Sequence, residues 1–245
     1  MTALKNMLAF ILYLFTRPGL LKPLTKGVYL PTYVQYEWLK KYKINTIIDI
    51  GANKGSVSKI LNFLFPKATI YAFEPLVNEC KIIKNIIKSD KLYIENIALS
   101  NKIGKATFMT NKFSAASSLL KLNNKSKNKM SLLKETRKII LKTDTLDHYF
   151  NDKQLKKKIF LKIDVQGTEK KVFEGGLNLL KKVSVIHVET SFEKIYKNQC
   201  LFKDVYNLLT KIGFVYAGNI KESEFYPYFD LPIQENSVFI NKSLL

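Results

Sequence analysis

Arginine is nearly absent from this sequence. Of its 40 basic residues, 38 are lysines, and only Arg17 and Arg137 are arginines. Arginine is the side chain that binds phosphates and nucleic-acid bases through two parallel hydrogen bonds. The composition therefore argues against a protein dedicated to reading nucleic acids, and we do not expect a nucleic-acid partner.

Cysteine and histidine are equally scarce. The chain has two cysteines, Cys80 and Cys200, and two histidines, His148 and His187. Their spacing is not that of metal ligands, so we expect no metal site, and two cysteines are too few for a disulfide framework. This composition fits the reducing cytoplasm, which is the location that we expect.

Long hydrophobic runs are missing as well. The uncharged apolar segment Met7–Phe15 lies between Lys5 and Arg17. As a helix it would be ~14 Å long, too short for the ~30 Å hydrocarbon core of a bilayer. No small-x-small cleavage site follows it, which argues against a signal peptide. Two interpretations remain: a helix packed on the domain, or an interfacial helix that rests peripherally on a membrane with help from the lysines.

The net charge is +20, because 40 Lys and Arg residues outnumber 20 Asp and Glu residues. One interpretation is a compositional drift toward lysine, isoleucine and asparagine along the whole chain. The other is a surface that binds an acidic glycan or an anionic lipid.

The length of 245 residues fits one domain with small appendages. We expect a helical N-terminal appendage over residues 1–43 and a main domain over residues 44–245, with an insertion at about 111–142. Residues 119–142 are rich in lysine and asparagine and have little periodicity. We interpret them either as an exposed insertion that covers the site or as a plain solvated loop.

From residue 44 onward, short β-branched runs alternate with segments whose apolar residues have helical spacing. This alternation predicts βαβ units and an α/β fold with a doubly wound, mostly parallel sheet that includes an antiparallel closing strand. Helices are expected over residues 169–181 and 202–212, and a β-ribbon over 105–110. The predicted strands are Thr46–Ile50, Ile70–Phe73, Leu92–Ala98, Ile159–Val165, Val183–Glu189, Phe214–Ala217 and Ser237–Asn241.

A glycine-containing turn, Asp49-Ile-Gly-Ala-Asn-Lys-Gly55, follows a predicted strand and opens a helix. Such a turn lies at the carboxyl edge of the sheet, where ligands bind, and Gly51 and Gly55 permit close approach of the backbone. The pattern D-x-G-x-x-x-G is neither the dinucleotide fingerprint nor a phosphate loop. Asp49 would repel a pyrophosphate. It favours a ligand with an ammonium group, such as the methionine part of S-adenosylmethionine (SAM).

A second acid stands at the end of the next predicted strand, in Phe73-Glu74-Pro75. An acid at this place hydrogen-bonds the ribose hydroxyls of a nucleotide. The alternative is that Glu74 is an exposed loop carboxylate. Asn96 and Ala98, at the end of the third predicted strand, would bracket an adenine ring.

Carboxylates also gather at the strand ends of the second half, beginning with Leu161-Lys-Ile-Asp-Val-Gln-Gly-Thr-Glu169. Methyl transfer depends mostly on alignment of donor and acceptor, and a hydroxyl acceptor also needs a base for its proton. Asp164 is the first candidate for cofactor contact or for the base, followed by Glu169 and Glu189. His187 is a further candidate, although a lone histidine within a strand is more often a core residue.

Together these residues resemble the FkbM family of SAM-dependent methyltransferases. The resemblance implies a class I methyltransferase, Rossmann-like fold, SAM as the cofactor, and an O-methylation, often of a sugar hydroxyl in a glycan or glycosylated product. It rests on segments that occur in the family's order between about residues 45 and 190: Asp49–Gly55, Phe73-Glu-Pro, Asn96-Ile-Ala-Leu-Ser, Thr145-Leu-Asp147, Leu161–Glu169 and His187-Val-Glu189.

The resemblance also implies roles for single residues. Ser117 and Ser118, in the serine-containing stretch 114–119, are expected near the substrate. Gln166 stands where an acid is common in the family, and Thr168 where a small or aromatic residue is common. The predicted cofactor residues are Asp49, Gly51, Ala52, Asn53, Gly55, Glu74, Pro75, Asn96, Ala98 and Asp164.

The hypothesis is thus a cytoplasmic O-methyltransferase that acts on a glycan or a small-molecule acceptor. One alternative is a SAM-binding protein without transferase activity. Another is an RNA methyltransferase, motivated by the charge of +20 but opposed by the two arginines and by the lack of an Asn/Asp-Pro-Pro-aromatic motif. A metal-dependent transferase is a further alternative, for which no ligand cluster is evident. The sequence assigns no oligomeric state.

Overall fold

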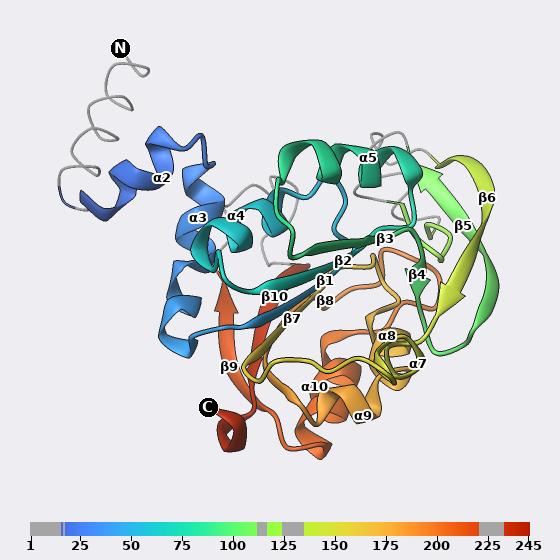
Figure 1. Ribbon diagram of the computed structural model, residues 1–245. Helices are drawn as coiled ribbons and strands as arrows, with labels where there is room; N and C mark the ends of the chain where they lie inside the picture. Colours follow the sequence, from blue (N-terminus) through green and yellow to red (C-terminus); the bar gives the residue numbers. More distant parts are fainter. Residues whose placement is uncertain (1–15, 17, 112–116, 124–134, 221–232) are drawn as a thin grey trace, which may run out of the picture.

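The computed structural model describes residue 16 and residues 18–111, 117–123, 135–220 and 233–245 (Figure 1). Three expectations fall partly or wholly outside these ranges. They are the apolar helix over residues 7–15, the first three residues of the stretch 114–119, and the middle of the insertion, residues 124–134.

A seven-stranded sheet forms the centre of the fold, in the order β3-β2-β1-β7-β8-β10-β9. Its inner strands are parallel, whereas β10 runs antiparallel to both of its neighbours. The predicted doubly wound, mostly parallel sheet with an antiparallel closing strand is confirmed. The strands are β1 Thr46–Ile50, β2 Thr69–Phe73, β3 Leu92–Glu95, β7 Ile159–Ile163, β8 Val183–Ser191, β9 Val215–Ile220 and β10 Gln234–Ile240.

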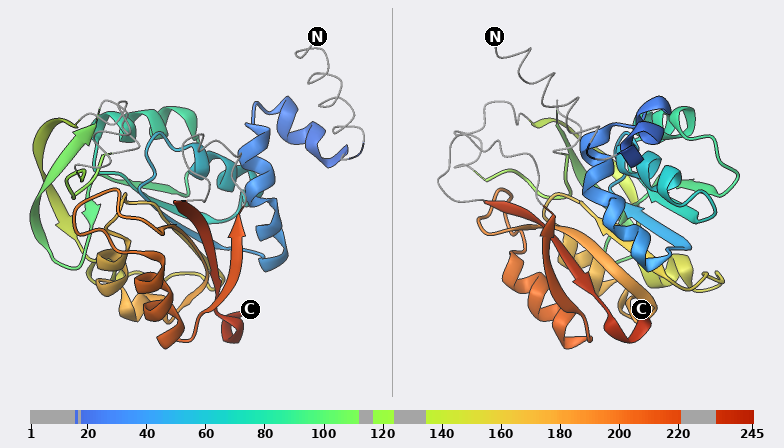
Figure 2. Two further views of the ribbon diagram at one scale, coloured as in Figure 1. Left: turned by 180° about the vertical axis from the view of Figure 1, so that it is seen from behind. Right: turned by 90° about the vertical axis from the view of Figure 1, so that its left-hand side faces the viewer.

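Helices cover both faces of this sheet (Figure 1 and Figure 2). Because helices cover the inner strands β1 and β7 on both sides, every residue of these two strands is buried, which explains their largely apolar sequences. One face carries α3 Leu30–Tyr36, α4 Ser56–Leu64 and α5 Val77–Ile86; the other carries α7 Leu146–Phe150, α8 Glu169–Glu174, α9 Leu177–Leu180 and α10 Phe202–Lys211.

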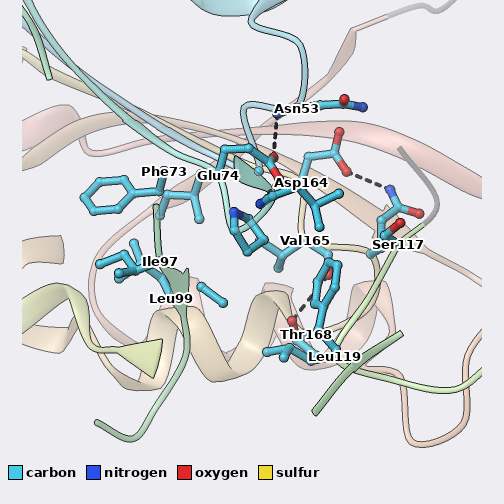
Figure 3. A pocket seen from close by; sticks show the side chains of 17 residues that line it. Asn53, Phe73, Glu74, Ile97, Leu99, Ser117, Leu119, Asp164, Val165 and Thr168 are labelled. Atoms are coloured by element: carbon cyan, nitrogen blue, oxygen red, sulfur yellow. Dashed lines mark hydrogen bonds between the residues drawn. The ribbon is translucent and has the colours of Figure 1, made fainter. Parts of the chain in front are cut away.

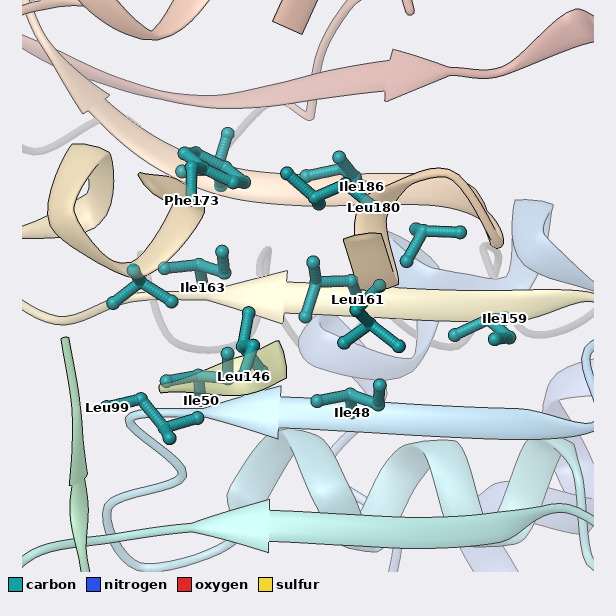
Figure 4. Close-up of a cluster of buried hydrophobic side chains, with 14 of the residues drawn as sticks. Ile48, Ile50, Leu99, Leu146, Ile159, Leu161, Ile163, Phe173, Leu180 and Ile186 are labelled. Atoms are coloured by element: carbon teal, nitrogen blue, oxygen red, sulfur yellow. The ribbon is translucent and has the colours of Figure 1, made fainter. Parts of the chain in front are cut away.

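The two faces have separate cores, because successive residues of a strand point to opposite sides. Ile47 and Phe160 pack with α3 and α4, whereas Ile48 and Leu161 pack with α8 and α9. Figure 4 shows the second core, with Ile48, Ile50, Leu161 and Ile163 beside Phe173 and Leu180.

The described residues before β1 form short helices: η1 Pro18–Leu20, α2 Leu21–Thr25, α3 and η2 Glu37–Tyr42. Tyr33, Tyr36 and Leu39 bury their side chains in the core under α4, so α3 and η2 belong to the packed body. Within the ranges that the structure describes, no helix has the length and apolar character needed to cross a bilayer.

A second, three-stranded sheet contains the β-ribbon predicted over residues 105–110 but otherwise departs from the expectations. It consists of β4 Ala98–Leu99, β6 Glu135–Asp144 and β5 Gly104–Asn111, in the order β4-β6-β5. The prediction of one strand over Leu92–Ala98 was wrong, because the chain leaves the central sheet after Glu95. Residues 135–142 of the predicted insertion lie within β6, which pairs along β5.

The helix expected over residues 169–181 is divided into α8 and α9 at Gly175 and Gly176. A Cβ on Gly175 would lie 2.2 Å from the carbonyl oxygen of Ser100, and one on Gly176 would lie 2.7 Å from the side chain of Leu146. The two glycines therefore allow this helical segment to pack closely against the loop after β4 and against α7.

Replacing Gly175 by alanine should lower the free energy of unfolding by about 1–3 kcal/mol, the usual result of overpacking. The added methyl group would collide with the backbone of Ser100. Urea denaturation followed by circular dichroism measures the effect. Gly19→Ala is the matched control, because no atom lies within 4 Å of a Cβ at that position. A Gly175→Ala variant as stable as the wild type would contradict the described packing.

Candidate active site

A pocket opens at the carboxyl ends of β1, β2 and β7 (Figure 3). Its empty space is about 600 Å³, which includes solvent space at the open mouth. The residues that line it come from strand ends, from the β4 segment and from the described part of the predicted insertion: Ile50, Gly51, Asn53, Phe73, Glu74, Pro75, Leu76, Ile97, Ala98, Leu99, Phe108, Ser117, Leu119, Asp164, Val165, Gln166 and Thr168.

The turn after β1 forms one side of the pocket. Gly51 has a φ of +75°, and a Cβ there would lie 1.9 Å from the carbonyl oxygen of Asp164, so only glycine fits. Gly51 and Asn53 line the pocket. Ala52 and Gly55 face away from it, against Ile83 of α5. The structure therefore brings two of these four predicted cofactor residues to the cavity.

Glu74 lies at the end of β2 and is only 5% exposed. Its Oε2 accepts a hydrogen bond from the backbone N–H of Asn53, and its Oε1 accepts one from Leu76, both at 2.8 Å. Figure 3 shows the bond to Asn53. Burial raises the pKa of Glu74 to about 7, although the two backbone donors oppose this rise. Glu74 is thus a buried acid beside the glycine turn, and the alternative of an exposed loop carboxylate does not hold.

The segment after β3 supplies an apolar wall. Ile97, Ala98 and Leu99 line the pocket together with Phe73. Asn96 does not line it; its Nδ2 donates to the carbonyl oxygens of Glu74 at 3.0 Å and Pro75 at 2.9 Å. Asn96 therefore holds the turn that carries Glu74, whereas Pro75 and Ala98 reach the cavity as predicted.

Asp49 is fully buried and does not line the pocket. Its Oδ2 accepts a hydrogen bond of 2.6 Å from Ser58, and its Oδ1 lies 3.4 Å from Nζ of Lys162. This corrects the expectation that Asp49 faces the ligand. Its carboxylate lies below the edge of the sheet, because Asp49 is a residue of β1 whereas Gly51, two residues later, follows the end of that strand.

Asp164 lies at the end of β7 and lines the pocket. Its Oδ1 accepts a hydrogen bond of 2.7 Å from Nε2 of Gln166, and the same nitrogen donates to Oε2 of Glu189 at 2.9 Å. The hydroxyl of Tyr196 donates to Oε1 of Gln166 at 2.9 Å. The side-chain amide of Gln166 thus joins the carboxylates of Asp164 and Glu189.

Glu169 is 3% exposed and lies outside the pocket. It accepts hydrogen bonds from the backbone N–H groups of Gly167 at 2.9 Å and Val165 at 3.3 Å. Burial raises the pKa of Glu169 to about 7. The structure therefore gives Glu169 the task of holding the turn after Asp164, not the role of a base.

His187 is likewise a core residue. Its Nδ1 lies 2.8 Å from the hydroxyl of Tyr36 and its Nε2 lies 2.8 Å from Oδ1 of Asn236. Burial lowers the pKa of His187 to about 4, so the ring is neutral. With both nitrogens engaged, His187 corresponds to the alternative of a satisfied core histidine.

The two predicted substrate serines have different positions. Ser117 lines the pocket, and its Oγ accepts a hydrogen bond of 2.8 Å from the backbone of Asn111. Ser118 is 1% exposed and donates to the carbonyl oxygen of Gln166 at 2.6 Å. In the described ranges, no group of three His, Cys, Asp or Glu side chains is arranged to hold a metal ion.

Three functional neighbours were missing from the sequence prediction: Lys162, Gln166 as a bridge, and Tyr196. Lys162 had a visible signal, because it is a charged residue inside the apolar strand Ile-Phe-Leu-Lys-Ile. Gln166 belongs to the segment Asp164-Val-Gln-Gly167, but the sequence shows only that it departs from the family pattern. Tyr196 is separated from Gln166 by 30 residues and had no signal in the sequence.

A sequence model described as "Methyltransferase FkbM domain" matches residues 49–216. The chain is 28% identical over 178 residues to the 2-O-methyltransferase NoeI of Sinorhizobium fredii (strain NBRC 101917 / NGR234), covering 69% of this chain and 72% of that protein.

The fold is similar to the crystal structure of methyltransferase FkbM from Methylobacillus flagellatus KT. The TM-score is 0.53 at 10% sequence identity, over 81% of this chain. The chain spans less than half of that structure's chain, 44% of its length. Together with the sheet order, this likeness confirms the predicted class I methyltransferase fold.

The Glu169→Gln variant should be more stable than the wild type at pH 8, and the difference should nearly vanish at pH 4. The folded-state pKa of about 7 lies above the usual 4.5, so the wild type loses stability as the pH rises through this window. The loss is about 3 kcal/mol. Thermal unfolding at both pH values measures it, with the exposed Glu174→Gln on the same helix as the control. A stability difference that does not change with pH would contradict the buried carboxylate.

Proposed function

Because the chain belongs to the FkbM methyltransferase family, we propose that it transfers the methyl group of SAM to a hydroxyl oxygen of a saccharide. The observation that carries the cofactor assignment is Glu74, a buried acid held between two backbone donors at the wall of the pocket. The acceptor would approach from the side of Asp164 and Ser117.

The residues of the pocket fit the parts of SAM. Glu74 offers carboxylate oxygens of the kind that bind ribose hydroxyls. Phe73, Ile97 and Leu99 give apolar surface suited to an adenine ring. The backbone at Gly51 lies open to the cavity and suits the methionine part, and Asp164 adds a negative charge for a ligand with two cationic groups. When bound, SAM supplies a methyl group on a positively charged sulfur.

The chain's own residues must then orient the acceptor and accept its proton. Asp164 lines the pocket and is fixed by donors at both oxygens, Gln166 on one and Lys162 on the other. Glu189 is joined to it through Gln166. We assign to this pair the binding of the acceptor hydroxyl and the uptake of its proton, with Asp164 as the first candidate for the base.

Two observations support an oxygen acceptor on a sugar. The relative with 28% identity is named a 2-O-methyltransferase, and the family resemblance of the sequence implies sugar hydroxyls. The charge of +20 suits an acidic saccharide or the anionic membrane surface on which lipid-linked saccharides lie.

The Glu74→Ala variant should bind SAM about 10- to 100-fold more weakly, since a hydrogen bond to a charged group contributes about 1.5–3 kcal/mol. Titration calorimetry at pH 8 measures the affinity. Wild-type affinity should fall as the pH drops below about 7, where Glu74 becomes protonated, and the variant should lack this dependence. Asp90→Asn, an exposed acid on the loop before β3, is the control. Unchanged affinity in Glu74→Ala would refute the cofactor assignment.

With labelled SAM and a panel of neutral and acidic saccharides, the wild type should label a sugar hydroxyl. Asp164→Asn and Glu189→Gln should each lower kcat about 100-fold or more, as expected for loss of a general base. The exposed Asp152→Asn should leave kcat unchanged. SAM binding without any transfer to the panel would favour a SAM-binding protein. Full kcat in both variants would remove the carboxylate pair from the chemistry.

A further inference from the structure

Lys162 is a charged residue in the middle of the central sheet. It is the fourth residue of β7, its side chain is 7% exposed, and it does not line the pocket. Burying a lysine is unfavourable unless opposite charges and hydrogen bonds compensate for the lost hydration. The surroundings of its ammonium group therefore show what the residue does.

The ammonium group lies among three oxygen atoms of two neighbouring strands. Nζ of Lys162 is 3.1 Å from the carbonyl oxygen of Gly51, 3.4 Å from Oδ1 of Asp49 and 3.5 Å from Oδ2 of Asp164. Asp49 and Lys162 are paired in the register of β1 and β7, and Asp164 follows on the same face. The lysine thus lies one row below the pocket and reaches up to its edge.

Lys162 compensates the buried negative charge of Asp49. Asp49 is fully buried, and within the described ranges its Oδ1 has no hydrogen-bond partner, so the nearby ammonium supplies the compensating charge. Burial lowers the pKa of Lys162, but the two aspartates outweigh burial and raise the pKa above its usual value. Lys162 is therefore a permanent cation beneath the site.

The position of the glycine turn depends on the same group. The backbone of Gly51 contacts that of Asp164 so closely that a Cβ would lie 1.9 Å from the Asp164 carbonyl oxygen. At this contact, the ammonium binds the Gly51 carbonyl on one strand end and the Asp164 carboxylate on the other.

We propose that Lys162 is a positioning residue for the methyl-donor site: it fixes the Gly51 peptide and keeps Asp164 as an oriented carboxylate toward the pocket. The inference rests on the proposed function, because it assumes that SAM binds between Gly51, Glu74 and Asp164. It assigns Lys162 no contact with SAM or with the acceptor.

The alternative is that Asp49 and Lys162 are a structural ion pair only. A buried pair of that kind can often be replaced by neutral side chains of similar shape with little loss of stability. The double variant Asp49→Asn/Lys162→Met makes this replacement and keeps an oxygen to accept from Ser58. If stability were the only role, the double variant would fold and bind SAM like the wild type.

The test measures SAM affinity by calorimetry, together with thermal unfolding, for the wild type, Lys162→Met and the double variant. We expect the double variant to recover most of the stability that Lys162→Met loses. Its Kd for SAM should nevertheless be at least about tenfold higher than that of the wild type, as expected for loss of charged hydrogen bonds. Lys171→Met, an exposed lysine on α8, is the matched control and should bind normally.

A pH comparison gives a second readout besides stability. Burial raises the pKa of Glu74 to about 7, and the charge of Lys162 opposes this rise. Without the ammonium, Glu74 takes up a proton at a higher pH, so the ratio of the double variant's Kd to the wild-type Kd should be larger at pH 6 than at pH 8.5. The other groups that act on Glu74 are Glu79 and the backbone N–H groups of Asn53 and Leu76, which both variants leave in place.

The outcomes differ for the two proposals. A wild type that does not bind SAM overturns the proposed function and this inference with it. A wild type that binds SAM, with a double variant of equal affinity at both pH values, overturns the role of Lys162 and leaves the function standing. A tenfold loss in the folded double variant, larger at pH 6, supports the role of Lys162.

Discussion

The contact between the backbones of Gly51 and Asp164 is the constraint on which the site depends. The two residues end β1 and β7, the neighbouring strands between which the sheet order changes direction. In doubly wound sheets, a crevice for ligands opens at such a switch point. Here the crevice is shaped by a glycine with φ of +75°, because any side chain would collide with the Asp164 carbonyl. A side chain at position 51 would therefore require the ends of β1 and β7 to move apart.

Polar residues lie on this edge in two rows. Asp49, Lys162 and His187 are register partners across β1, β7 and β8 and form a buried row. Gly51, Asp164 and Glu189 follow two residues later on each strand and form the row at the edge. The lower row contains the compensating cation and a neutral imidazole, and the upper row contains the groups that reach the pocket or join those that do. A shift of two residues along a strand thus separates the buried residues that support the site from the residues at the sheet edge that line or adjoin the pocket.

This division explains how far the sequence could predict the site. The alternation of strands and helices and the closing antiparallel strand follow from local patterns, as does the convergence of Gly51, Glu74 and Asp164 at one edge. The depth of Asp49 and His187 depends on register between strands, which one sequence does not encode visibly. Glu169 accepts a hydrogen bond from the backbone of its own loop, and Asn96 donates to the backbone carbonyl of Glu74. The spacing of residues in the sequence does not indicate either hydrogen bond. The strand over residues 135–144 lacks the alternation that would identify it.

The proposed acceptor side is formed by contacts between segments that are distant in the sequence, and Gln166 lies where these segments meet. Its φ of +55° is unusual for a residue with a side chain. Its carbonyl accepts from Ser118, its side-chain oxygen accepts from Tyr196, and its nitrogen donates to both Asp164 and Glu189. Leu122 and Tyr196 are also joined by a β-bridge. The segments 117–123 and 192–200 therefore both contact Gln166, the first at its backbone carbonyl and the second at its side-chain oxygen. Changes in these segments should therefore act on the Asp164–Glu189 pair, and changes at Ser117 or Leu119 should also alter the wall of the pocket.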